Sequence, residues 1–236
     1  MLIDTHVHTS GISACGRLPY DEVIRRAKAI GLDGLVLTNH YFQGYVKDGN
    51  YRAFAERYVA EYEKAHEYGL QEDFAVLYGV ELTWEAVGGA HVLLYGLPLS
   101  FVLDHPTLFD YSPEKLCTLV HEAGGVLVQA HPLRRGGRVL DLRYLDGIEM
   151  NCHPLYEGPL YADLEPVARE GNKFITCGSD YHGDVPFRPN CGIFCPEGTD
   201  TTEKLRDYLC SVTAQRLRLS EVDGAVREEN FERASV

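Results

Sequence analysis

The feature that most constrains this chain is a pair of histidines in an apolar stretch at its start, Ile3-Asp4-Thr5-His6-Val7-His8-Thr9. In an extended strand successive side chains point to opposite faces, so His6 and His8 share one face about 7 Å apart, with Asp4 on the same face. Two imidazoles placed in this way can chelate one metal ion. The sequence therefore predicts a first strand over residues 2–9 that carries metal ligands.

A second pair with the same spacing lies near the other end of the chain, in Gly178-Ser179-Asp180-Tyr181-His182. Between the two pairs, four further residues of metal-binding type each border a short apolar run: His40, Glu81, His91 and His131. A single histidine near a strand end is most often an ordinary hydrogen-bonded residue, and one His-x-His pair is weak evidence. The recurrence of such residues at one strand end after another is what predicts a shared site.

Short apolar runs alternate with helical patterns along the chain. Beyond residues 2–9, strands are predicted over 35–37, 74–82, 91–95, 126–130, 147–150 and 173–177. Apolar residues at helical spacing predict helices over 20–30, 51–68, 112–122, 160–170 and 202–212. This alternation is typical of an α/β fold with a mostly parallel sheet, and we expect the strands to form one barrel.

We expect a single domain over residues 1–236, with a motif-bearing core at about 2–185 and a C-terminal helix and tail over 200–236. A loop is predicted over 183–198, and the charged tail is expected to fray from residue 225. In a parallel α/β barrel, functional side chains lie at the C-terminal ends of the strands, where nearly all of the candidate ligands stand. His91 is the exception because it begins its strand, so that segment either runs the other way or has a misread boundary.

Composition excludes several classes of function. The formal net charge of −13 disfavours non-specific nucleic-acid binding, because phosphate contacts need Lys and Arg. No apolar run of about 18 residues predicts a membrane span, and Asp4 and His6 interrupt the opening residues, which does not favour a signal peptide. The seven cysteines are odd in number and scattered, which favours the reduced thiols of a cytoplasmic protein. Cys191 and Cys195 have a Cys-x-x-x-Cys spacing, but no second pair follows to predict a zinc site there.

The candidate ligands mix imidazole and carboxylate with no obvious thiolate, which suits ions such as manganese, iron and zinc. Eight candidates are too many for one ion and enough for two or three. Multi-metal sites of this kind are typical of hydrolases, because the ions lower the pKa of a bound water towards about 7 and stabilise the attacking and leaving oxygens at phosphorus. Glu149 and His153 share one strand face after His131, and we expect them to support the ligands.

These motifs, in this order, resemble those of the PHP (polymerase and histidinol phosphatase) family, a branch of the amidohydrolase-like metal enzymes. The resembling segments are Asp4-Thr5-His6-Val7-His8-Thr9, Leu37-Thr38-Asn39-His40, Gly79-Val80-Glu81, His91-Val92-Leu93, Ala130-His131-Pro132 and Gly178-Ser179-Asp180-Tyr181-His182. The resemblance implies a distorted (βα)7 barrel, two or three divalent ions (manganese, iron or zinc) and hydrolysis of phosphoesters. Two positions depart from the family pattern. Asn39 stands where Asp is usual, and Cys15 stands near a frequent Asp or His ligand. Cys15 is therefore a thiolate ligand, a bystander or a sign that a third ion is weakly held.

The resemblance also implies roles for individual residues. His6, His8, Glu81, His131 and Asp180 would surround the most buried ions, and His40, His91 and His182 would complete the set. Glu81 would be the bridging carboxylate, and Asp180 would bind metal and orient or deprotonate the attacking water. Our own hypothesis adds that His182 or a metal-bound water protonates the leaving group. Arg134, Arg135 and Arg17 are candidates to bind the substrate phosphate, since peripheral phosphate oxygens need cationic donors.

We therefore predict a metal-dependent hydrolase, either a phosphatase or a phosphodiesterase, that cleaves a phosphoester of a small metabolite or nucleotide through a metal-bridged hydroxide. One alternative is an amidohydrolase that cleaves a C–N bond on the same metal centre. Another is a metal-binding PHP module with a non-catalytic role in an assembly. The sequence does not indicate the substrate, the native metal or the oligomeric state.

Overall fold

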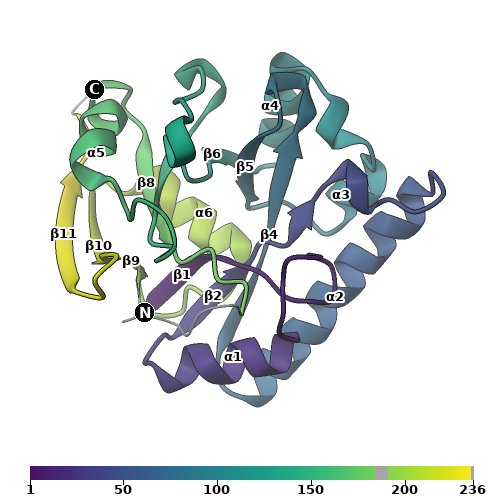
Figure 1. The fold of residues 1–236 in the computed structure, drawn as a ribbon, viewed down its shortest axis with the longest axis horizontal. Coiled ribbons are helices and arrows are strands. Elements are labelled where there is room, and N and C mark those ends of the chain that lie inside the picture. The colour runs from purple at the N-terminus through teal and green to yellow at the C-terminus, as the bar shows by residue number, and fades with distance from the viewer. Residues whose placement is uncertain (184–190, 235–236) are drawn as a thin grey trace.

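The computed structural model describes residues 1–183 and 191–234, and its centre is a sheet that curls into a nearly closed barrel (Figure 1). The barrel strands lie side by side in the order β1 (Leu2–Val7), β2 (Gly34–Leu37), β4 (Ala75–Trp84), β5 (Ala90–Tyr95), β6 (Val126–Gln129), β7 (Gly147–Asn151) and β8 (Phe174–Gly178). Backbone hydrogen bonds join the two ends of this series: the His8 N–H donates to the Tyr181 carbonyl over 3.0 Å and the Asp180 N–H to the His6 carbonyl over 2.8 Å. The predicted α/β barrel is confirmed.

Strand direction explains the position of His91. The neighbouring pairs β1–β2, β2–β4, β6–β7 and β7–β8 are parallel, whereas β5 is antiparallel to both β4 and β6. The start of β5 therefore lies at the same end of the barrel as the C-terminal ends of the parallel strands. A short strand, β3 (His40–Tyr41), pairs with β4 so that His40 stands opposite Glu81.

Helices pack around the barrel and at one of its ends. They are α1 (Tyr20–Ala29), α2 (Tyr51–Gln71), α3 (Ser100–Asp104), α4 (Pro113–Glu122), α5 (Tyr161–Glu170) and α6 (Thr202–Ser211). Single 3₁₀ turns connect the larger elements: η1 (Gln43–Tyr45), η2 (Glu85–Val87), η3 (Leu108–Asp110), η4 (Arg134–Gly136) and η5 (Leu142–Tyr144). Helix α4 begins as the sequence predicts, because the Ser112 side chain accepts a hydrogen bond from the Lys115 N–H and Pro113 stands in the first turn.

Helix α6 packs at the end of the barrel opposite the candidate ligands. Its first residue, Thr202, accepts a hydrogen bond from the Gly96 N–H over 2.8 Å, and Gly96 directly follows the antiparallel strand β5. Leu205 and Leu209 of α6 are fully buried in one cluster with Tyr95. One end of the barrel is thus filled with apolar side chains, which leaves the other end for polar chemistry.

Two expectations for the last fifty residues are wrong. Gly192–Phe194 forms strand β9 within the predicted loop, and it pairs with β1; residues 184–190 of that loop lie outside the described residues. The tail does not fray at residue 225, because β10 (Ala214–Ser220) and β11 (Val226–Glu232) form an antiparallel hairpin that extends the sheet beyond β9 (Figure 1). The charges of the tail pair across the hairpin, as Arg218 does with Glu228, and Phe231 is buried.

No helix in the described part of the chain is both long enough and apolar enough to cross a membrane.

Candidate metal centre

Four side chains from three strand ends meet inside the mouth of the barrel. His6 belongs to β1 and His8 follows it, Glu81 belongs to β4, and Asp180 follows β8. Each is at most 2% exposed, and one donor atom from each lies within 4.8 Å of the donor atoms of the other three. These are imidazole and carboxylate donors in one buried place, which is the composition that transition-metal sites use.

The donor atoms lie close together without making hydrogen bonds. His8 Nε2 is 3.3 Å from Glu81 Oε2 and 3.0 Å from Asp180 Oδ1, and His6 Nε2 is 3.4 Å from each of the same two oxygens. Among the described residues, none of these four atoms has a hydrogen-bond partner. A buried polar atom without a partner costs about 1–3 kcal/mol, so four in one place need an explanation. Lone pairs that converge on one point without hydrogen bonds fit a shared cation.

Glu81 lies at the centre of a ring of histidines. Its Oε2 lies 2.6 Å from His40 Nδ1, a contact that also lacks hydrogen-bond geometry. Its Oε1 lies 2.7 Å from His91 Nδ1 and 2.9 Å from His131 Nε2. Both oxygens of this carboxylate therefore face imidazoles.

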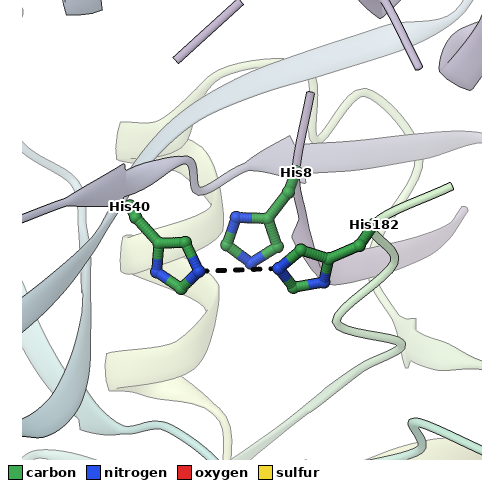
Figure 2. Close-up of side chains that lie close together, drawn as sticks. All are labelled: His8, His40 and His182. Carbon is green, nitrogen blue, oxygen red and sulfur yellow. Dashed lines mark hydrogen bonds between the residues drawn. The ribbon is translucent and has the colours of Figure 1, made fainter. Parts of the chain in front are cut away.

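A third group of donors lies towards the opening. His8, His40 and His182 bring one ring nitrogen each to within 4.8 Å of one another, and Figure 2 shows the ring of His8 between the other two. His182 Nε2 is 3.5 Å from His40 Nε2, while His182 Nδ1 lies 2.8 Å from the Asp180 carbonyl, which orients its ring. All eight sequence-predicted ligands thus gather at one end of the barrel, around Glu81 and His8.

Glu149 supports the cluster from behind, as its strand position predicts. Its Oε1 lies 2.7 Å from His6 Nδ1, and its Oε2 accepts hydrogen bonds from the His131 N–H over 2.7 Å and from the Asn151 side chain over 3.2 Å. A carboxylate on the second nitrogen of a histidine orients the ring and makes it a better ligand. His6 Nε2 is consequently directed into the cluster.

Asn39 takes a structural role that a carboxylate could not fill. Its Oδ1 accepts hydrogen bonds from the Thr9 N–H and the Ser13 hydroxyl, over 2.8 and 2.9 Å, and its Nδ2 donates to Thr9 Oγ1 over 2.9 Å. Ser13 Oγ in turn lies 3.2 Å from His8 Nδ1. The amide of Asn39 therefore supplies a donor that fixes the loop beside His8.

Asp4 does not join the donor cluster, although it shares a strand with His6 and His8. Its Oδ1 accepts hydrogen bonds from the backbone N–H groups of His6 and Ser179, and its Oδ2 from the Ser179 hydroxyl over 2.5 Å. Burial raises the pKa of Asp4 to about 7, even though these hydrogen bonds favour the ionised form. Asp4 ties β1 to the end of β8 and so helps to close the barrel.

Two of the candidate ligands have strained backbones. Asp180 has φ +52° and His131 has φ +31°, in the left-handed region that non-glycine residues seldom adopt. Such conformations cost about 1–3 kcal/mol each and cluster at functional sites. The fold holds these two side chains where an ordinary strand end would not direct them.

Burial and neighbouring charges shift the pKa values of several side chains in the cluster. Burial would raise the pKa of Glu81, but the nearby charges of His40, His91 and His6 bring it well below its usual range. Burial opposes a charge on His40, yet the Glu81 carboxylate and Cys15 raise its pKa to about 10. Burial and repulsion from His182 and His40 hold the pKa of His8 well below its usual range. Without ions, protons on some of the imidazoles compensate the buried carboxylates.

The cluster opens into a cleft of about 460 Å³. Cys15, Arg17, Arg134, His153 and Tyr156 line it together with the ligands nearest the opening. Burial raises the pKa of the Cys15 thiol, but hydrogen bonding to His182 and His40 outweighs this and lowers it to about 6. Cys15 therefore lies beside two of the outer imidazoles.

The three predicted arginines differ in their surroundings. Arg134 donates from Nη2 to Asp180 Oδ2 over 2.6 Å and to Asn151 Oδ1 over 2.7 Å, and its guanidinium lies 4.1 Å from the centre of the Tyr156 ring. Arg17 is exposed at the rim of the cleft. Arg135 is also exposed and lines an adjoining groove. Arg134 is therefore the arginine that is held in place beside the donor cluster.

Sequence reasoning missed the contribution of Tyr156, which orients Arg134 through its ring. It lies in an irregular stretch after β7 with no pattern that could have marked it. Asn151 could have been found, because it shares strand parity with Glu149 and His153.

Comparison with solved structures finds the same fold in proteins of low sequence identity. PsfC from Pseudomonas syringae PB-5123 superposes with a TM-score of 0.61 at 20% identity, covering 88% of this chain and 87% of that one. A candidate metal-dependent phosphoesterase from Bifidobacterium adolescentis ATCC 15703 gives a TM-score of 0.55 at 18% identity, covering 88% and 95% of the two chains. An amidohydrolase from Chromobacterium violaceum, solved with bound sulfate and no metal, gives 0.56 at 20% identity, covering 84% and 93%.

These likenesses show that the chain shares the fold of these three structures. By sequence, no protein-family model and no curated protein matches it.

Proposed function

We propose that this protein is a metal-dependent phosphoesterase of the PHP type that acts on a small phosphorylated metabolite or nucleotide. The observation that carries the proposal is a set of buried donor atoms that lie against one another with no hydrogen-bond partner in the described residues: His6 Nε2, His8 Nε2, His40 Nδ1, Glu81 Oε2 and Asp180 Oδ1. Divalent cations would supply the missing partners. The fold shared with a candidate metal-dependent phosphoesterase adds support.

The donor set fits two or three ions of manganese, iron or zinc. His6, His8, Glu81 and Asp180 would hold the innermost ion, and His40, His91, His131 and His182 would complete the cluster with Glu81 shared between ions. When bound, the ions supply the positive charge that activates water and stabilises the oxygens at phosphorus.

The chain's own groups would move protons and orient the substrate. Asp180 directs one carboxylate oxygen into the cluster and the other to Arg134, so it is fixed to orient the attacking water or take its proton. His182 is held through Nδ1 by the Asp180 carbonyl, which leaves Nε2 towards the cleft. This nitrogen would either protonate the leaving oxygen or bind an ion, in which case a metal-bound water would supply the proton. Arg134 would donate to a peripheral phosphate oxygen, and the exposed Arg17 and Arg135 would contact the rest of an anionic substrate.

Hydrolysis of a C–N bond is the alternative, and the amidohydrolase of the same fold is the observation that favours it. Parallel panels of phosphomonoesters, phosphodiesters and amides separate the two readings. If substitution of His6 and Asp180 left catalysis unchanged but weakened an assembly, the protein would instead be a binding module.

The decisive experiment combines elemental analysis with a substrate screen. Purified protein is expected to contain two or more equivalents of transition metal, and chelation is expected to abolish phosphoester hydrolysis until metal is restored. Asp180→Asn should lose activity, whereas Asp110→Asn, at an exposed turn, should retain it. Full activity in a metal-free preparation would overturn the proposal.

A further inference from the structure

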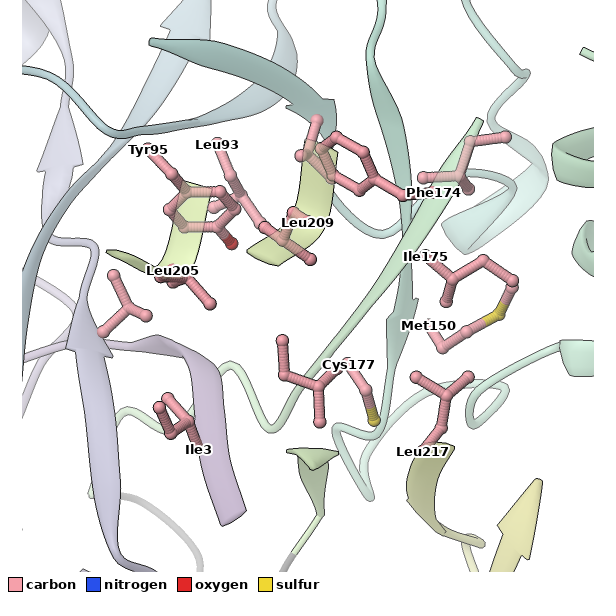
Figure 3. Packing of buried hydrophobic residues seen from close by; sticks show 14 of the residues in the cluster. Ile3, Leu93, Tyr95, Met150, Phe174, Ile175, Cys177, Leu205, Leu209 and Leu217 are labelled. Carbon is pink, nitrogen blue, oxygen red and sulfur yellow. The ribbon is translucent and has the colours of Figure 1, made fainter. Parts of the chain in front are cut away.

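Three cysteines far apart in the sequence meet in the core outside the candidate metal centre. Cys152 follows β7, Cys177 lies in β8 and Cys191 immediately precedes β9. All three are buried, and their sulfur atoms lie within 4.8 Å of one another, with 3.6 Å between Cys152 and Cys177. Figure 3 shows Cys177 in apolar surroundings near Met150 and Leu217.

This thiol cluster lies on the opposite face of the barrel wall from the donor cluster. Along β7, Glu149 and Asn151 face the candidate metal centre, where they contact His6 and Arg134. Because side chains alternate along a strand, Met150 and Cys152 face the other way, towards β10. The backbone agrees, since the Ser220 N–H of β10 donates to Cys152 Sγ over 3.4 Å. The thiols therefore form a separate site.

The spacing of the sulfurs matches that of a metal–thiolate site. A cation bonded to three sulfurs at about 2.3 Å holds them about 3.8–4.0 Å apart, for tetrahedral or planar arrangements. The Cys152–Cys177 distance of 3.6 Å is close to this value, and all three sulfurs lie within 4.8 Å of one another. Cys195 is not in this group, so the Cys-x-x-x-Cys spacing of the sequence does not form a pair; Cys191 joins two residues from other strands instead.

The surroundings of the thiols contain a donor and an unpaired hydroxyl. The Ser220 N–H bond to Cys152 is of the kind that stabilises a thiolate. The Ser220 hydroxyl is buried and has no hydrogen-bond partner among the described residues. Cys177 donates its S–H to the Arg218 carbonyl over 3.2 Å, a bond that ligation would replace. The site therefore offers three soft thiol ligands, and β10 supplies a backbone donor that contacts one of them.

We propose that Cys152, Cys177 and Cys191 bind one thiophilic divalent cation of the zinc class, at a site distinct from the imidazole–carboxylate cluster. Binding replaces three S–H bonds with three metal–sulfur bonds and releases three protons to solvent, with no change of oxidation state. The product carries one net negative charge, whereas a monovalent cation would leave two, and a buried charge is costly. A divalent ion is therefore preferred in this apolar core.

Cadmium is the probe that distinguishes this site, because thiolate ligation produces a charge-transfer absorption that imidazole and carboxylate ligation do not. The full chain is reduced, stripped of metal, and refolded with Cd²⁺. All variants carry Cys15→Ser, which removes the thiol that lines the cleft. We expect the thiolate band of the Cys15→Ser chain to saturate at the intensity of one Cd²⁺ ion bound by three thiolates, while ions that enter the imidazole–carboxylate cluster add nothing to the band. We expect Cys191→Ser or Cys177→Ser to abolish it.

The matched control is Cys195→Ser, a buried cysteine four positions beyond Cys191 that is expected to leave the band unchanged. A band that survives Cys191→Ser, or that disappears with Cys195→Ser, would overturn the proposal, as would the lack of any band in the Cys15→Ser chain. Should the cluster variants fail to fold, ¹¹³Cd NMR of the Cys15→Ser chain decides alone. A resonance in the region of sulfur-rich ligands supports the site, and resonances confined to the nitrogen and oxygen region refute it.

Discussion

The mouth of the barrel and the β10–β11 hairpin both concentrate charged side chains, but they compensate charge in different ways. In the hairpin, Arg216 and Arg218 pair with Glu228 across the strands, in the solvent-accessible part of the sheet. At the mouth, Glu81 and Asp180 are buried, and each keeps one oxygen with no hydrogen-bond partner in the described chain. Exposed ion pairs contribute little to the stability of the fold, whereas a buried polar atom without a hydrogen-bond partner destabilises it. The contrast indicates that the charges at the mouth are kept to bind a ligand, whereas those of the hairpin compensate one another.

The largest expected effect comes from Glu81→Gln. The amide keeps the volume of the side chain but removes the negative charge that five imidazoles face. Metal retention and the rate of hydrolysis should therefore both fall by more than about 100-fold, which is more than the effect expected for a residue that only supports a ligand. Elemental analysis after gel filtration and initial rates check this. Retention of both metal and activity would show that the cluster is not the metal centre.

Glu149→Gln tests the support behind His6. The amide still fills the space but weakens the contact to His6 Nδ1, so metal affinity should fall by about 10–100-fold. Competition with a chelator of known affinity gives the value. Glu165→Gln, on the surface of α5, is the control that should leave the affinity unchanged.

Arg134→Ala should lower kcat/KM for a phosphoester by about 10- to 100-fold, because a hydrogen bond to a charged group contributes about 1.5–3 kcal/mol. Arg135→Ala, at the adjoining groove, should have a smaller effect. Steady-state kinetics on metal-saturated protein separate the two. The reverse order would mean that the anion binds in the groove.

Apparent metal affinity should rise with pH. His40 has a pKa of about 10 in the metal-free chain, so it must lose a proton before it can bind an ion. For each proton released on binding, the apparent affinity for metal should rise about tenfold per pH unit below that pKa. The raised pKa of His40 also stabilises the folded metal-free chain. This contribution to the free energy of unfolding is complete below pH 6.5 and is lost as the pH rises through about 10. Titrations at several pH values in one buffer series check the slope, and a flat profile would exclude proton displacement.

The smallest effect is expected in the hairpin. Glu228→Gln removes exposed ion pairs with Arg216 and Arg218, so the free energy of unfolding should fall by at most about 1 kcal/mol, with activity unchanged. Urea denaturation and a rate measurement suffice. A loss of activity here would mean that the hairpin and the mouth are coupled.

Much of the fold was predictable because its signals are local. Alternation in the first strand and helical periodicity in α1 and α4 depend on neighbouring residues, and ligand-type residues at successive strand ends indicated a common site. The hairpin was missed because Val226–Glu232 has few apolar residues, and its strand depends on pairing with β10. Tyr156 was missed for a related reason, since its ring matters only through Arg134.

The sequence by itself determined which residues could bind metal and that they stand at strand ends, because the side-chain period of a strand and the chemistry of imidazole and carboxylate are local properties. Only the tertiary structure decided that Glu81 would face five histidines, that Asp4 would close the barrel instead of binding, and that Cys191 would meet Cys152 and Cys177 instead of Cys195. Those outcomes depend on strand order and direction, which arise from contacts between segments far apart in the chain.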